Sequence, residues 1–99
     1  MNPFVEETEV DRIELVDGEW IDIKRRLAYQ DSDLLTSDDI KDIQGNSSAV
    51  PLLKMCIVAW SFKDEQGQPV PITVERLRRL DIGIGAKIME QIRNRVPFV

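Results

Sequence analysis

The sequence predicts an α+β fold, with an N-terminal β-hairpin followed by a small bundle of three to four α-helices. Apolar and polar residues alternate on both sides of Asp17-Gly18, which is typical of two strands joined by a tight turn. A long apolar run occupies residues 47–62, and two further runs with helical spacing follow the capping residues Thr73 and Asp81. Strands first and helices after them indicate the α+β class.

The 99 residues are enough for one domain with a modest core. We expect residues 1–99 to form that domain, with a loose segment at residues 1–9, the hairpin at residues 10–25 and the helical part at residues 31–96. The net charge of −5 disfavours nucleic acid and anionic membranes as partners. One cysteine allows no internal disulfide, and the acidic N-terminal residues do not look like a secretory signal, so we expect a cytoplasmic protein.

The face that each hairpin residue takes depends on the length of the turn. A two-residue turn at residues 17–18 would put Ile13 and Ile21 on opposite faces of the hairpin, because side chains alternate along a strand. A three-residue loop at residues 16–18 instead pairs Ile13 with Ile21 and makes one face apolar. We therefore predict the three-residue loop, with Gly18 in the left-handed conformation that lacks a Cβ penalty.

The same register predicts the other face of the hairpin. Arg12 lies opposite Asp22 there, as a cross-strand ion pair. Trp20 is on this face too, away from the isoleucines, which makes it the better interface candidate of the two tryptophans.

One or two short helices are expected between residues 31 and 46, with Leu27 and Tyr29 in the core before them. The possible N-caps are Asp31, Ser32 and Ser37. The run at residues 47–62 is then predicted to be the central helix, with Pro51 in its first turn. Because that helix is apolar nearly all round, we expect part of its surface to meet another chain.

The loop at residues 63–71 is expected to be a stiff connector between the central helix and the C-terminal helices. Gly67 permits its turn, while Pro69 and Pro71 restrict it. Thr73 is the expected N-cap of the helix that follows.

No catalytic, metal-binding or cofactor-binding residues are predicted, so we do not expect an enzyme. The chain has no histidine, which removes the commonest general base and metal ligand. Cys56 lies inside an apolar run and is expected to be buried. The aspartates of residues 31–42 lack the spacing of a calcium loop, and residues 83–87 lack that of a phosphate loop.

Protein binding is the remaining class. Arginines cluster around residues 76–79 and near the C-terminus. Solvated helix faces are the commoner explanation of such clusters, and a protein interface is the other, because arginine is enriched at interfaces. The candidate interface residues, chosen for apolar excess and arginine placement, are Trp20, Leu53, Ile57, Trp60, Arg76, Leu77, Arg79, Leu80, Ile84 and Ile88.

Several short sequence motifs follow one another along the chain in a recognisable order. An Asp-Gly-x-Trp element at residues 17–20 precedes Leu-x-Tyr-x-Asp at residues 27–31. Trp-Ser-Phe at residues 60–62, an Asp-x-x-Gly-x-Pro-x-Pro loop at residues 64–71 and Leu-Asp at residues 80–81 follow. This order resembles the small tail assembly chaperones of long-tailed, siphovirus-type bacteriophages. The likeness spans about residues 10–95 and departs at residues 32–48, where the family has a longer Ala/Arg-rich helix and this chain is rich in aspartate.

The resemblance implies a protein that binds the phage tape measure protein, keeps it soluble and helps to recruit tail tube subunits. Such a chaperone acts in the host cytoplasm and is not retained in the virion. Self-association stays open, as do two other functions. One is a structural phage component, such as a head–tail connector or minor tail protein, and the other is a bacterial protein-binding adaptor.

Overall fold

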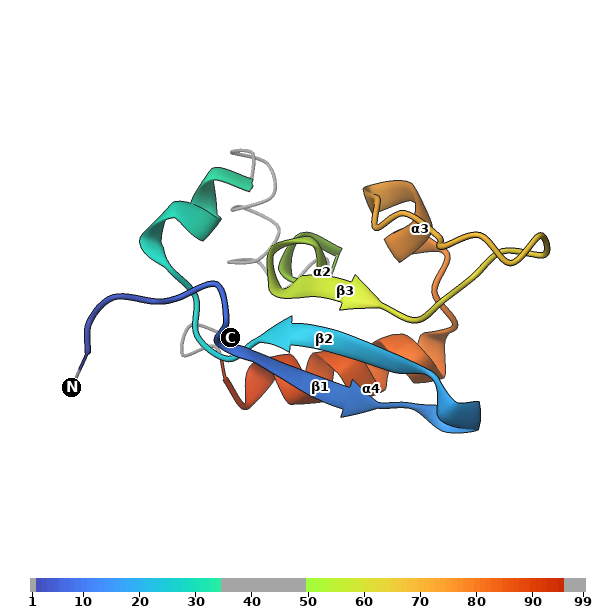
Figure 1. Cartoon of the computed structure of the whole chain (residues 1–99), viewed down its shortest axis with the longest axis horizontal. Coiled ribbons are helices and arrows are strands. Elements are labelled where there is room, and N and C mark those ends of the chain that lie inside the picture. Colours follow the sequence, from blue (N-terminus) through green and yellow to red (C-terminus); the bar gives the residue numbers. More distant parts are fainter. Residues whose placement is uncertain (1, 35–49, 96–99) are drawn as a thin grey trace.

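Three antiparallel strands form a sheet in the order β1-β2-β3, and the helices pack against it (Figure 1). The computed structural model describes residues 2–34 and 50–95. The fold is mixed α+β, as predicted. Its elements are β1 (Val10–Glu14), η1 (Val16–Gly18), β2 (Trp20–Lys24), η2 (Tyr29–Leu34), α2 (Val50–Cys56), β3 (Ile57–Trp60), α3 (Val74–Arg78) and α4 (Ile82–Arg93).

The predicted register of the hairpin is confirmed. Ile13 pairs with Ile21, and Arg12 pairs with Asp22 across β1 and β2. The turn itself differs from the prediction, because Asp17 as well as Gly18 has a positive φ, 57° and 75°. An aspartate tolerates this conformation better than most residues, since its short polar side chain can bond locally.

The predicted central helix at residues 47–62, of which residues 47–49 lie outside the described residues, is wrong after Cys56. Helix α2 ends there, and residues 57–60 form β3, which pairs with β2. Ile57, Val58 and Trp60 are β-branched or aromatic side chains that favour strands, and β2 offers them a free edge. The hairpin therefore becomes a three-stranded sheet. The excess apolar helix surface inferred from an all-helical run does not exist in this form.

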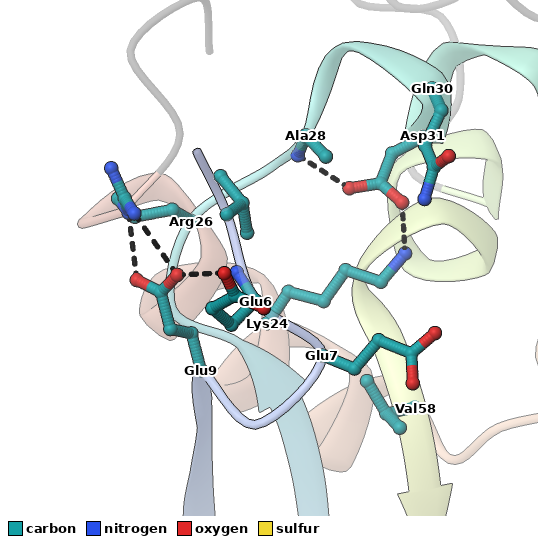
Figure 2. A pocket seen from close by; sticks show the side chains of 10 residues that line it. Glu6, Glu7, Glu9, Lys24, Arg26, Ala28, Gln30, Asp31 and Val58 are labelled. Atoms are coloured by element: carbon teal, nitrogen blue, oxygen red, sulfur yellow. Dashed lines mark hydrogen bonds and ion pairs between the residues drawn. The ribbon is translucent and has the colours of Figure 1, made fainter. Parts of the chain in front are cut away.

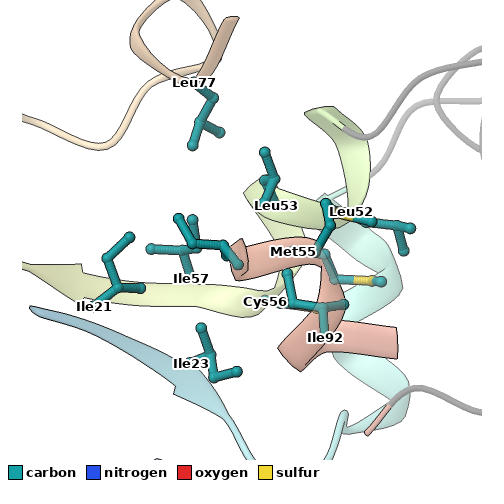
Figure 3. Close-up of a cluster of buried hydrophobic side chains, with 11 residues drawn as sticks. Ile21, Ile23, Leu52, Leu53, Met55, Cys56, Ile57, Leu77 and Ile92 are labelled. Atoms are coloured by element: carbon teal, nitrogen blue, oxygen red, sulfur yellow. The ribbon is translucent and has the colours of Figure 1, made fainter. Parts of the chain in front are cut away.

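The core lies between the inner face of the sheet and the helices (Figure 3). Ile21 and Ile23 of β2 are 0% exposed. In α4, Ile88 is 0% and Ile92 is 1% exposed. In Figure 1 helix α4 passes behind β1 and β2, whereas no described helix lies in front of them. Among residues 2–34 and 50–95, the sheet therefore has one covered face and one open face.

The segment before α2 differs from the prediction in two respects. Asp31 and Ser32, expected as possible N-caps, lie inside the 3₁₀ helix η2 (Tyr29–Leu34). Tyr29 was expected in the core, but it is 98% exposed. It begins the 3₁₀ helix η2, whose Asp31 carboxylate accepts hydrogen bonds from the Lys24 ammonium at 2.6 Å and the Ala28 N–H at 2.7 Å. Leu27 packs against the core as expected. The helices predicted between residues 35 and 46 lie outside the described residues.

The last two helices begin where the capping residues predicted. The Thr73 hydroxyl accepts from the Arg76 N–H, and the Asp81 carboxylate accepts from the Ile84 N–H at 3.1 Å. Pro51 lies in the first turn of α2, also as predicted. At the end of α4, Arg95 bonds to Asp11 of β1 at 3.1 Å, which ties the helix to the sheet.

Candidate protein-binding site

A groove of about 460 Å³ lies at the end of the sheet where β2 begins and β3 ends. We call it the tryptophan groove. Its walls come from the η1 turn, from the strand ends and from the loop after β3. The lining residues are Gly18, Glu19, Trp20, Trp60, Ser61, Phe62, Lys63 and Pro69.

Ser61 holds the start of β2 at one side of the groove. The Trp20 N–H donates to the Ser61 hydroxyl oxygen at 2.8 Å, and the Ser61 N–H donates to the Trp20 carbonyl at 3.0 Å. The Ser61 hydroxyl in turn donates to the Glu19 carboxylate. The N–H groups of Trp20 and Ser61 and the Ser61 hydroxyl are thus all hydrogen-bonded within the wall. The backbone that carries Trp20 is therefore fixed in position.

Trp60 is held at the other side of the groove. Its indole N–H donates to the Val70 carbonyl at 2.6 Å, which satisfies the one polar atom of the ring. The ring also lies 5.2 Å from that of Phe62, tilted by 50°. The distance lies within the range of favourable aromatic pairs.

The loop at residues 63–71 was expected to connect two helices, but it connects strand β3 to helix α3 and folds back on itself. Asp64 Oδ1 accepts from the N–H groups of Gln66 and Gln68, both at 2.9 Å, and Gly67 has a φ of 79°. Lys63 and Pro69 face each other across this loop as an isolated β-bridge. The loop is therefore a closed turn, and it supplies one wall of the groove.

Arg12 covers Trp20 from the open face of the sheet. Its guanidinium carbon lies 3.7 Å from the centre of the indole ring. The same guanidinium makes two hydrogen bonds to Asp22, at 2.8 and 3.1 Å, and this raises the pKa of Arg12 above its ordinary value. Trp20 is thereby held between a fixed cation and the groove.

The structure separates the predicted interface residues into three groups. Trp20 and Trp60 come together in the tryptophan groove, although they are far apart in the sequence. Arg76 and Arg79 are exposed at α3. The others belong to the core or pack against it. Leu53, Ile57, Leu77 and Ile88 are at most 6% exposed, and Leu80 and Ile84 are partly buried against that core.

The four fully packed side chains stabilise this chain itself, so in the folded protein they are not available to a partner. Figure 3 shows Leu53, Ile57 and Leu77 directed toward the other buried side chains. A contact surface must therefore be sought elsewhere, and the tryptophan groove is where predicted residues and open space coincide.

Sequence reasoning missed four residues of this region: Arg12, Glu19, Ser61 and Phe62. The signal for Arg12 was present, since the predicted register places it diagonally across from Trp20. The role of Ser61 depends on β3 pairing with β2, which the helical reading of that segment concealed.

A second cavity of about 450 Å³ lies between the N-terminal segment, the end of β2 and η2 (Figure 2). Its charged groups are largely paired with one another, because Lys24 bonds Asp31 at 2.6 Å and Arg26 bonds Glu9 at 2.8 Å. The Arg26 hydrogen bonds lower the pKa of Glu9 from 4.5 to about 2. Arg26 also donates to the carbonyls of Asn2 and Phe4, so this region fastens the N-terminal segment to the sheet.

The described residues contain little reactive chemistry. Within residues 2–34 and 50–95, no three side chains of the His, Cys, Asp or Glu type are grouped so that they would hold a metal ion. Cys56 is 2% exposed, and burial raises the pKa of its thiol to about 11, whereas a reactive thiol needs a lowered pKa. None of the helices in these ranges combines the length and apolar composition needed to cross a bilayer.

Comparisons with protein-family models, with curated proteins and with solved structures found no match for this chain.

Proposed function

We propose that this chain is a phage tail assembly chaperone, which holds a helical segment of the tape measure protein in the tryptophan groove, keeps it soluble and helps to recruit tail tube subunits. The observation that carries the proposal is the meeting of Trp20 and Trp60 in one open groove. The resemblance of its sequence elements, in their order, to those of the small tail assembly chaperones adds to it.

The groove has the properties of a binding site for an apolar helix face. Tryptophan is enriched among the residues that dominate binding energy, because it buries a large area and has few rotatable bonds. Ser61 fixes the backbone of Trp20, and Val70 fixes the Trp60 ring, so little conformational entropy remains to be lost on binding. Amphipathic helices bind such grooves through apolar side chains at spacings of three and four residues.

The acidic balance of the chain suits a partner that would otherwise aggregate. The groove lining carries one charged residue of each sign, Lys63 and Glu19, whereas the net charge of the chain is −5. A complex that buries the apolar stripe of a tape measure helix and presents this acidic exterior repels other copies of itself. Solubility of the partner is therefore the property to measure.

The test is co-expression with the tape measure protein encoded nearby in the same phage genome. We expect the tape measure protein to be insoluble alone, and to become soluble and co-purify with the wild-type chain. The Trp20→Ala variant should lose most of this effect. Tyr29→Ala is the matched control, since it removes an aromatic ring that is 98% exposed and outside the groove.

Two results would overturn the proposal. One is a tape measure protein that remains insoluble and does not associate with a chain shown to be folded by circular dichroism. The other is recovery of this chain as a component of purified particles, which would instead support a structural phage protein.

A further inference from the structure

Strand β1 is an edge of the sheet, and its free backbone groups can be assigned. The N–H of Arg25 donates to the Glu9 carbonyl, and the N–H of Leu15 donates to the Glu19 carbonyl. In an antiparallel pair such bonds recur at every second residue, so the odd-numbered residues of β1 bond to β2. The N–H and C=O groups of Arg12 and Glu14 therefore point outward. Among the described residues, no other strand pairs with this edge.

The opposite edge of the sheet is less suited to pairing. Strand β3 has four residues, its pairing with β2 shifts register between Asp22 and Ile23, and it follows directly on helix α2. Short, irregular edges of this kind resist the addition of another strand. Strand β1, in contrast, has five residues in unbroken register with β2.

We propose that a second copy of this chain pairs with the free edge of β1, in antiparallel orientation, with the two Ile13 residues opposite each other. The two sheets then become one sheet of six strands around a twofold axis. This inference does not rest on the proposed chaperone function, although one residue, Arg12, lies both on the β1 edge and over Trp20 of the groove.

Charge selects this register over its neighbours. With Ile13 at the axis, Arg12 of each copy lies opposite Glu14 of the other, and two ion pairs form on the open face of the sheet. Moving the axis to Arg12 would place two arginines opposite each other, and moving it to Asp11 would oppose two aspartates. Only the register centred on Ile13 pairs unlike charges.

The side chains needed for these ion pairs are accessible. The Arg12 side chain is 55% exposed and bonds Asp22 through Nε and one of its two terminal nitrogens. Glu14 is exposed and, within the part of the chain that the structure describes, takes part in no ion pair. Charged side chains on an edge strand usually prevent nonspecific pairing. Here, however, Arg12 and Glu14 of one copy are complementary in charge to Glu14 and Arg12 of a second copy.

The contact is small for a protein interface, so the dimer should be weak and concentration-dependent. Sedimentation equilibrium from about 10 μM to about 1 mM should therefore show a reversible monomer–dimer equilibrium. The Glu14→Arg variant should weaken it by about tenfold or more, because two attractive pairs become repulsive. Glu75→Arg makes the same charge change at an exposed position of α3 and should leave the equilibrium unchanged.

A mixing experiment shows whether the chains associate through the β1 edge or through another surface. Arg12→Glu and Glu14→Arg should each be monomeric alone, because each opposes like charges to itself. An equal mixture should associate, since every cross-strand pair is then of unlike charge. Amide hydrogen exchange gives a second readout, in which the N–H groups of Arg12 and Glu14 gain protection at high concentration.

A wild-type chain that is monomeric across the whole concentration range would overturn the inference. So would a dimer that Glu14→Arg leaves intact, since it must then use another surface. Circular dichroism of each variant establishes that loss of association does not come from loss of the fold.

Discussion

The backbone N–H of Trp20 donates to the hydroxyl oxygen of Ser61 at 2.8 Å, so a side chain takes the place of a backbone acceptor where β2 and β3 meet. The Ser61 N–H completes the contact by donating to the Trp20 carbonyl. Ser61 thus makes the last contact between β2 and β3, beside the groove that both tryptophans line. The stability of this end of the sheet and the shape of the groove are thereby coupled.

Ser61→Ala should lower the free energy of unfolding by about 1 kcal/mol, because the half-buried N–H of Trp20 loses its acceptor. Urea unfolding followed by tryptophan fluorescence measures the change. Ser61→Thr keeps the hydroxyl and should retain most of the stability. An alanine variant as stable as the wild type would show that water replaces the serine without cost.

Ile88→Ala should lower the free energy of unfolding by about 2–5 kcal/mol, because Ile88 is 0% exposed and its loss leaves a cavity under the sheet. The matched control is Ile82→Ala in the same helix, where the isoleucine is 89% exposed. Thermal unfolding should show a large shift for the first variant and little for the second. Equal shifts would contradict the position of α4 against the core.

Acid should destabilise the fold in part through Glu9. Its pKa is lowered from 4.5 to about 2 by hydrogen bonds from Arg26. A group with a lowered folded-state pKa stabilises the fold above its ordinary pKa, and this stabilisation is lost as the pH falls toward the folded value. Stability should therefore decline between about pH 4.5 and pH 2.

Arg26→Gln should flatten this part of the pH profile, and Arg78→Gln, an exposed arginine of α3, should not. Melting temperatures measured across the acid range give the comparison. If both variants follow the wild-type profile, the Glu9–Arg26 pair does not contribute to the acid sensitivity.

The thiol of Cys56 should react slowly with a thiol reagent in the native chain and rapidly in denaturant. Burial at 2% exposure blocks access, and a pKa of about 11 leaves almost no thiolate at neutral pH. Absorbance of the released chromophore measures the rate. Fast labelling without denaturant would mean that α2 opens readily.

The hairpin could be predicted to the level of its register, because a three-residue turn places Ile13 and Ile21 on the same face and a two-residue turn does not. Helix starts at Thr73 and Asp81 were equally accessible, since capping is a local interaction. These features depend on residues close together in the sequence.

The third strand could not be predicted in the same way. Residues 50–60 are almost continuously apolar, and such a run has no periodicity that separates a buried helix from a buried strand. The change from helix to strand after Cys56 comes from pairing with β2, a non-local interaction. The groove depends on the same pairing of β3 with β2. The sequence therefore identifies both tryptophans as interface candidates, but it does not predict that they line one groove.

The central claim, that the tryptophan groove binds the tape measure protein, is tested most directly by nuclear magnetic resonance. The two indole N–H signals of the ¹⁵N-labelled chain report Trp20 and Trp60 separately, and an apolar-striped helical segment of the tape measure protein is the titrant. We predict shifts of the Trp20 indole signal and of the backbone amides of Ser61 and Lys63, with the amides of η2 unchanged. Binding that leaves these groove signals unmoved and shifts another surface would contradict the account.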